Sequence, residues 1–449
     1  MSVRFMLAAA LLAGTASAAA PALAQAPQAA PAAAATNLPP ANPQAVVAQV
    51  RRIIADRYVL PERRPALDAV LAEGLSSGRY AVTDSATLAQ RINEDLARVG
   101  QDGHLNFRFD PRQAQMLAAA GGGAGGPSDP SAMERQVRAN NHGVRELRVL
   151  PGNIRYMDYR GFEWIGPESA AALENAMRFL SGGDAIVIDL RYNGGGDPAA
   201  VQYLVSHFME PGRPLMTFHM NGQPSPDRTA TLAELPAGRF VGKPLYVLTS
   251  PMSASAAEEF AGHVAGYRLG ELVGGNTAGA GFRNDMVPIE GGYLLSVSVG
   301  RAVLAATGRD WEGVGIAPTI QAQVPQALDA AQAHALRRLA TTAPEAERPR
   351  LAALADALTA RFEPRTAALP LSAYAGRFGE RVVTLDGNRL TYRFADRPVI
   401  NLLPLGGNRF ALDSDPAVQV NFAAAGDRVS GFEMTTAGYP EVRRYERTQ

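Results

Sequence analysis

The hydrophobic pattern over residues 43–104 is helical. In the stretches PQAVVAQVRRIIADRYVLPE and ATLAQRINEDLARVG, apolar side chains recur at intervals of three and four positions. This spacing places them on one face of an α-helix. The apolar positions of the first stretch are Val46, Val47, Val50, Ile53 and Ile54. We therefore predict an N-terminal helical segment over 43–104 that contains two or three helices.

From about residue 146, short apolar runs alternate with amphipathic stretches. NIRYMDYRGF, DAIVIDLRYNGGG and KPLYVLTS resemble buried strands, whereas PESAAALENAMRFLSGG and AAEEFAGHVAGY have helical spacing. This alternation is typical of an α/β fold in which helices cover parallel strands. We predict an α/β domain with a mostly parallel sheet over 105–345, and a Gly-rich loop at 119–131. Functional residues of such sheets gather at the carboxyl ends of the strands.

The last part of the chain has an all-β pattern. It follows an Ala/Arg-rich helical stretch at 326–361. Short strand-like runs are then separated by the turn sequences DGN, GGN, DSDP and AGD. We predict a separate small all-β domain of meander or barrel type over 366–449.

The first residues have the features of an export signal. Arg4 precedes the apolar run FMLAAALLAG, which is too short to span a bilayer, and ALA at 22–24 is typical of a cleavage site. An amphipathic core helix would need polar residues on one face, and this run has none. We predict a signal peptide at 1–24 and an Ala/Pro-rich linker at 25–42. The protein is then exported to the periplasm or secreted, without stable membrane insertion after cleavage.

Charge and cysteine content exclude several functions. The chain has 43 basic and 43 acidic residues, so its net charge gives no indication of nucleic-acid binding. Cysteine is absent, which excludes disulfides and thiolate metal sites. Lys243 is the only lysine. We expect neither a cofactor nor a metal.

The strand DAIVIDLRYNGGG ends in a glycine loop at 194–196. Successive glycines allow backbone N–H groups to converge on an oxyanion or a phosphate. The alternative is a tight turn that needs positive φ. Phosphate binding is disfavoured because neither GxGxxG nor GxxxxGK[ST] is present. Asp189 and Arg191, just before the loop, are also candidates for chemistry.

The stretch SPMSASAAEEFAGH contains Ser250, Ser253 and Ser255 after a predicted strand. Ser255 and Glu258 fit the capping-box pattern S-x-x-E, which marks the start of a helix. Taken alone, the pattern favours a cap. A serine at this turn can also be a nucleophile, because the helix N-terminus stabilises developing negative charge. G-x-S-x-G itself is absent.

His104 lies in the polar turn QDGH, beside Asp102 and Gly103. A single histidine is usually structural. Its position between a predicted helix and a predicted strand also suits a general base.

Four stretches, taken together, resemble a known family. QDGHLNFRF, AIVIDLRYNGGG, LTSPMSASAAEEFAGH, and LVGGNTAGAGF followed by WEGVGIAPTI resemble the tail-specific (C-terminal processing) serine peptidases. The most similar branch contains the tricorn core and the interphotoreceptor retinoid-binding-protein-like proteins. The resemblance covers roughly residues 43–322. It implies an α/β core of the ClpP/crotonase-like type.

The resemblance implies roles for particular residues. The nucleophile maps to Ser255, and the histidine and glutamate of the triad map to His104 and Glu312. The oxyanion donors map to the backbone amides of Gly195 and Ala256. A Ser–His–acid triad is chemically coherent, since imidazole can take the hydroxyl proton and a carboxylate can fix its tautomer.

Two family features are missing. The lysine of the processing peptidases would fall at Ala280, so a Ser–Lys dyad is not expected. Only about 80 residues separate His104 from Ile186, which leaves no room for a PDZ domain. The resemblance implies a serine peptidase that forms an acyl-enzyme with peptide or unfolded-protein substrates. The alternatives are a non-catalytic ligand- or peptide-binding relative, and an esterase or amidase that acts on small substrates.

Overall fold

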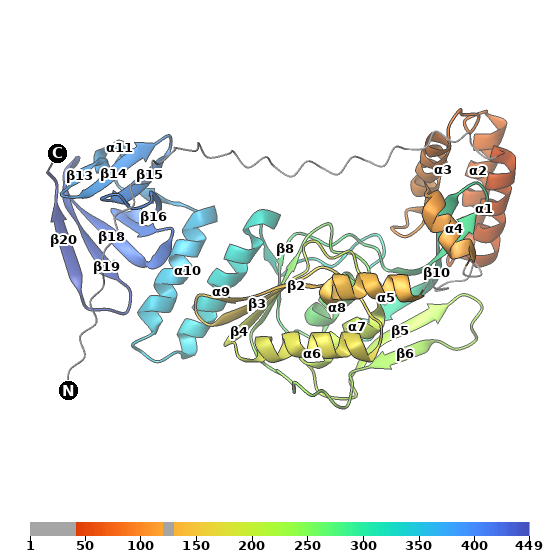
Figure 1. Ribbon diagram of the computed structural model, residues 1–449, viewed down its shortest axis with the longest axis horizontal. Helices are drawn as coiled ribbons and strands as arrows, with labels where there is room; N and C mark the ends of the chain where they lie inside the picture. Colours follow the sequence, from red (N-terminus) through yellow and green to blue (C-terminus); the bar gives the residue numbers. More distant parts are fainter. Residues whose placement is uncertain (1–41, 120–129, 449) are drawn as a thin grey trace, which may run out of the picture.

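The computed structural model describes residues 42–119 and 130–448. Along its longest axis lie an N-terminal helical part, a central part with two sheets, and a C-terminal β domain (Figure 1). The predicted signal peptide, nearly all of the linker and most of the Gly-rich loop lie outside the described residues. No helix among the described residues is long and apolar enough to cross a membrane.

The N-terminal part confirms the helical prediction. Three helices form it: α1 Pro43–Arg57, α2 Arg64–Ser76 and α3 Ser85–Gly100. Four of the five apolar residues predicted to share a face of α1 are buried: Val46, Val47, Val50 and Ile54. They share a hydrophobic cluster with side chains of an antiparallel sheet described below, including Phe107, Tyr293 and Leu295. The helices are thus packed against the sheet that carries the QDGH turn.

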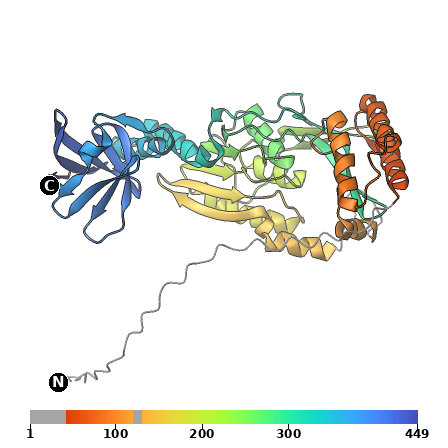
Figure 2. The same cartoon turned by 90° about the horizontal axis from the view of Figure 1, so that it is seen from above.

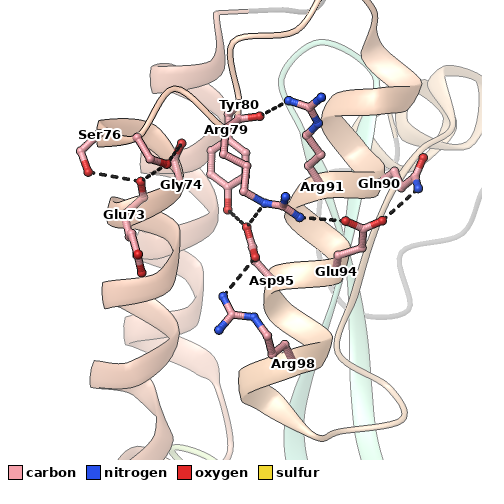
Figure 3. Close-up of polar contacts among 11 residues, drawn as sticks. Glu73, Gly74, Ser76, Arg79, Tyr80, Gln90, Arg91, Glu94, Asp95 and Arg98 are labelled. Carbon is pink, nitrogen blue, oxygen red and sulfur yellow. Dashed lines mark hydrogen bonds and ion pairs between the residues drawn. The ribbon is translucent and has the colours of Figure 1, made fainter.

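A buried carboxylate fixes the connection between α2 and α3 (Figure 3). Asp95 is 4% exposed and accepts hydrogen bonds from Tyr80 Oη and Arg79 Nε, both at 2.9 Å. Arg98 Nη2 lies 3.2 Å from its other oxygen. Because α3 ends directly before the QDGH turn, this network holds the helix that positions His104.

The central sheet has the strand order β11-β8-β7-β4-β3-β2. All neighbouring strands are parallel except β2 and β3. The bounds are β2 Val144–Leu150, β3 Ile154–Tyr159, β4 Ala185–Asp189, β7 Leu245–Thr249, β8 Glu271–Gly274 and β11 Ile320–Gln321. This sheet confirms the predicted α/β architecture.

Helices cover both faces of the central sheet. Ile186 and Ile188 of β4 pack into a cluster with α6 Pro167–Ser181, α7 Pro198–Ser206 and α8 Ala256–Gly266. Val187, which points the other way, packs into a cluster with α9 Ala327–Thr342 and α10 Arg348–Phe362. Burial on both faces explains why β4 and β7 are almost continuously apolar.

A second sheet is antiparallel, and the sequence did not predict it. Its order is β1-β10-β5-β6, with β9 also paired to β10. The bounds are β1 Asn106–Phe109, β5 Pro214–Met220, β6 Asp227–Ala230, β9 Phe282–Ile289 and β10 Tyr293–Leu304. The first eight residues of β10 are all buried, so it lacks the alternation that marks an antiparallel strand with one face in solvent.

The helical stretch predicted at 326–361 is two helices, α9 Ala327–Thr342 and α10 Arg348–Phe362. The break falls at Ala343, which is extended because it precedes Pro344. Both helices lie between the central sheet and the β domain (Figure 2).

The C-terminal part is a nearly closed antiparallel sheet in the order β13 to β20, and β12 pairs with β16. Beyond β20, the Thr448 amide donates to the Arg377 carbonyl of β13 at 2.8 Å. The bounds are β12 Arg365–Ala367, β13 Gly376–Phe378, β14 Arg381–Asp386, β15 Arg389–Phe394, β16 Ile400–Gly407, β17 Arg409–Leu412, β18 Asp415–Ala425, β19 Arg428–Thr436 and β20 Val442–Glu446. The predicted all-β character is confirmed.

Short helices complete the described chain. They are α4 Pro111–Ala119, α5 Pro130–Ala139, α11 Leu371–Tyr374, and the 3-10 turns η1 Pro61–Arg63, η2 Asn141–Gly143 and η3 Val324–Gln326. The interval between His104 and Ile186 is occupied by α4, α5, α6 and strands of the two sheets. Its described residues form no separate PDZ domain.

Candidate active site

Ser255 lies at a strained turn between β7 and α8. β7 ends at Thr249, and α8 begins at Ala256. The Ser255 backbone has φ 54° and ψ −119°, whereas an N-cap residue is normally extended. Positive φ in a residue with a side chain costs about 1–3 kcal/mol and concentrates at functional sites. Ser255 is therefore the helix start that the sequence predicts, in a conformation that capping alone does not require.

Glu258 holds this turn. Its carboxylate is fully buried and accepts the Ser255 N–H at 2.9 Å. It also accepts from Thr277 Oγ1 at 2.6 Å, the Gly279 N–H at 2.6 Å and the Ala280 N–H at 2.8 Å. One carboxylate thus joins the Ser255 turn to the 277–280 loop. The sequence indicated only the first of these contacts, because the other three come from a distant loop.

The glycine loop lies against Ser255. A Cβ on Gly195, whose φ is 108°, would lie 2.8 Å from Ser255 Cβ and 3.0 Å from the Ala256 nitrogen. Only glycine permits this approach. The Ala256 N–H has no acceptor among the described residues. The Gly195 N–H donates to Asn193 Oδ1 at 2.9 Å, so this predicted oxyanion donor is engaged.

Asp189 and Arg191 pair with each other. Arg191 donates to both Asp189 oxygens, at 2.9 and 2.7 Å, and to the Val324 carbonyl at 2.7 Å. The pair ties the end of β4 to η3, which is a structural role.

A second cluster contains His104, Asp102 and Glu312. One ligand atom of each lies within 4.8 Å of the others. Burial lowers the pKa of His104, and the charge of Asp102 opposes the shift. The His104 Nδ1 is buried, and no hydrogen-bond partner for it is found among the described residues. The structure thus brings together a histidine and a glutamate that are 208 positions apart in the chain.

Glu312 is held by backbone amides. Its Oε1 accepts the Gly103 N–H at 2.9 Å, and its Oε2 accepts the N–H groups of Gly281 at 2.5 Å and Phe282 at 2.9 Å. Burial, together with the charge of Asp102, raises the pKa of Glu312 to about 7, although these hydrogen bonds act to lower it. Glu312 therefore titrates near neutral pH.

Asp102 is a carboxylate that the sequence left without a role. Its Oδ1 accepts from the N–H groups of His104 and Leu105 and from Ser298 Oγ, at 2.8, 3.2 and 3.0 Å. Its Oδ2 is buried, and none of the residues that the structure describes forms a hydrogen bond with it. Its position two residues before His104 was the available signal.

The Ser255 turn and the His104 turn meet at one loop. A Cβ on Gly103 would lie 3.1 Å from Ala280 Cβ, and the Ala280 N–H is held by Glu258. No hydrogen bond among the described residues joins Ser255 Oγ to His104. Catalytic hydrogen bonds are often long before substrate binds and tighten in the complex.

Two family models match the chain. The model described as peptidase family S41 matches residues 153–322. The model described as the N-terminal domain of peptidase S41 in eukaryotic IRBP matches residues 32–138. Together the two models cover more than half of the chain. The model of the N-terminal domain precedes the model of the peptidase domain, and both describe peptidase S41. The chain belongs to peptidase family S41. It is accordingly a serine-type peptidase.

Solved structures of low identity also match this S41 peptidase. The photosystem II D1 C-terminal processing protease is 18% identical, with 63% of this chain and 94% of that chain covered and a TM-score of 0.40. A putative peptidase from Parabacteroides merdae is 18% identical, with 63% and 90% covered and a TM-score of 0.43. The tricorn protease is 12% identical, with 63% and 34% covered and a TM-score of 0.39. The family assignment rests on the family models.

The only lysine of this S41 peptidase, Lys243, forms hydrogen bonds away from the Ser255 turn. Lys243 Nζ donates to the carbonyls of Ser181 at 2.8 Å and Gly183 at 2.5 Å. It precedes β7, whereas Ser255 follows that strand, so the two lie at opposite ends. Ala280, where the resemblance would place a lysine, contacts the His104 turn instead.

A cavity of about 280 Å³ adjoins Ser255 in the S41 peptidase. Its walls include Phe218, Trp311 and the side chain of Glu259. A cavity of this size beside the candidate nucleophile suits one substrate side chain.

The cluster of Asp102, His104 and Glu312 also has a spacing that could hold a metal ion. A histidine and carboxylates in such a cluster also suit proton transfer to and from a serine hydroxyl.

Proposed function

We propose that this S41 peptidase hydrolyses peptide bonds through Ser255, His104 and Glu312, with an acyl-enzyme intermediate. The strained turn at Ser255 carries the proposal. It sets the hydroxyl at the start of α8, where the free Ala256 N–H and the helix dipole favour an oxyanion. Peptides or unfolded proteins are the proposed substrates.

Each residue has a role in this proposal. Ser255 Oγ attacks the carbonyl carbon, and His104 accepts its proton and returns it to the leaving amine. The lowered pKa of His104 keeps it neutral, as a base must be, at pH 7. Glu312, beside Asp102, offsets the charge of the imidazolium.

The oxyanion site combines two amides. Ala256 supplies one donor directly. Gly195 supplies the other when its N–H leaves Asn193 Oδ1, which is 2.9 Å away in this structure. Loss of one such donor typically lowers kcat by about 10²- to 10³-fold.

We also propose that the protein is exported. Arg4, the apolar run after it and ALA at 22–24 support a cleaved signal peptide. Mass spectrometry of the periplasmic fraction tests this directly. We expect to find the chain there without residues 1–24.

We expect the activity to fall as the pH drops below about 7. Catalysis needs Glu312 ionised, and its raised pKa of about 7 lies above that of His104, so Glu312 sets the acid limb. Folding responds in the opposite direction. A raised pKa in the folded state adds stability that is complete below the usual glutamate pKa and is lost as the pH rises through about 7.

The rate of labelling by a fluorophosphonate between pH 5 and 9 checks this limb. Glu312→Gln is expected to move the limb to lower pH, where His104 titrates. An acid limb that stays near pH 7 in Glu312→Gln would contradict the assignment.

Hydrolysis of denatured casein compared with p-nitrophenyl esters tests the substrate class. We expect cleavage of casein, with new amino termini. Ester cleavage without peptide cleavage would favour an esterase. Labelling without any turnover of either substrate would favour a peptide-binding relative.

A further inference from the structure

Glu259 is a buried carboxylate with no hydrogen bond. It follows Glu258 in α8 and is 5% exposed. Glu258 has four donors, whereas no donor among the described residues reaches the Glu259 carboxylate. His263 Nε2 lies 3.8 Å from Glu259 Oε1, which is beyond hydrogen-bond distance. A buried charge normally has a partner, because its desolvation is costly.

Glu259 shares a cavity with the candidate nucleophile. Both Ser255 and Glu259 line the space of about 280 Å³ beside the start of α8. Phe218, Trp311 and Ala302 provide an apolar wall. The cavity therefore combines an apolar wall with an acidic residue beside Ser255.

The other charges at the cavity are exposed. Arg283 and Asp197 both line it and are open to solvent, which screens them. The Arg283 guanidinium carbon lies 5.3 Å from the centre of the Phe218 ring. Glu259 is the buried charge among the three, so its field is screened least. Glu259 is thus the buried acidic residue of this cavity.

We propose that this cavity binds the cationic side chain, arginine or lysine, of the residue whose carbonyl Ser255 attacks. The long methylene stem suits the apolar wall, and the charged head reaches Glu259. Arginine has the additional advantage of a bidentate fork. The proposal rests on the proposed function, because the cavity is a substrate site only if Ser255 is the nucleophile.

Binding to the Ser255→Ala variant isolates the pocket from catalysis. The probes are acetyl-Ala-Ala-X-amide peptides in which X is arginine, its neutral isostere citrulline, or norleucine. We expect the arginine peptide to bind roughly 10- to 100-fold more tightly than the citrulline peptide by titration calorimetry. Equal or tighter binding of citrulline or norleucine would overturn the proposal, and this comparison needs no change at Glu259.

Two further variants locate the preference. Glu259→Gln, added to Ser255→Ala, is expected to reduce the arginine-to-citrulline ratio to about 1. Asp197→Asn, an exposed carboxylate of the same cavity, is the matched control and should change the ratio less than about twofold. An arginine preference that persists in Glu259→Gln would show that another group recognises the arginine, and it would overturn the proposal.

Fluorophosphonate labelling of the wild-type chain separates this inference from the proposed function. Labelling at Ser255 without an arginine preference overturns the inference alone. An arginine preference without labelling contradicts the catalytic role of Ser255 and leaves Glu259 as the cation-binding group.

Discussion

Replacing Ser255 with alanine is expected to lower kcat for peptide hydrolysis by roughly 10⁵- to 10⁶-fold. The hydroxyl is the only group that the account assigns to attack on the carbonyl, so nothing in the site replaces it. Covalent labelling by a fluorophosphonate should disappear with it. Initial rates on a fluorogenic peptide, measured at matched protein concentration, give the comparison.

Ser253 is the matched control, two residues earlier in the same turn. Its Oγ donates to the Leu190 carbonyl at 2.7 Å and accepts the Ser250 N–H at 3.0 Å. Ser253→Ala is therefore expected to reduce the free energy of unfolding by about 1–3 kcal/mol while labelling persists. Wild-type turnover in Ser255→Ala would exclude Ser255 as the nucleophile.

Replacing Glu258 with alanine is expected to reduce the free energy of unfolding by about 3–5 kcal/mol. The change leaves the Ser255, Gly279 and Ala280 amides and Thr277 Oγ1 without their acceptor in a buried site. The strained Ser255 backbone then loses the acceptor of its N–H group, so labelling should slow as well. Chemical denaturation and labelling rates measure the two effects.

Glu259 provides the control for this prediction, because it is an adjacent buried glutamate without hydrogen bonds. Glu259→Ala is expected to reduce the free energy of unfolding by less than Glu258→Ala does, because it removes no hydrogen-bond acceptor from buried donors. Equal losses in the two variants would show that burial, and not the four donors, determines the effect of Glu258.

The sequence predicted those parts of the fold that depend on local periodicity. The spacing of Val46, Val50 and Ile54 predicts α1, and the apolar run at 185–189 predicts β4. The antiparallel sheet was missed because β10 is buried on both sides, which removes the alternation of its type. Strand direction depends on tertiary packing, which the pattern of one strand does not contain.

The candidate site was predicted in part. S-x-x-E indicated the helix start at Ser255, but the positive φ of Ser255 depends on contacts with distant loops. The family resemblance, and not spacing, linked His104 with Glu312. The engagement of the Gly195 amide by Asn193 was missed, because it depends on one side-chain orientation. Unpartnered atoms, such as Asp102 Oδ2, leave no signal in a sequence.

Peptide mapping of the fluorophosphonate adduct tests the central claim most directly. The wild-type chain is labelled at neutral pH, digested and examined by mass spectrometry. We expect one adduct, on the peptide that contains Ser255, and none in Ser255→Ala. An adduct on another residue that persists in Ser255→Ala, or an active wild-type chain that takes up no label, would contradict it.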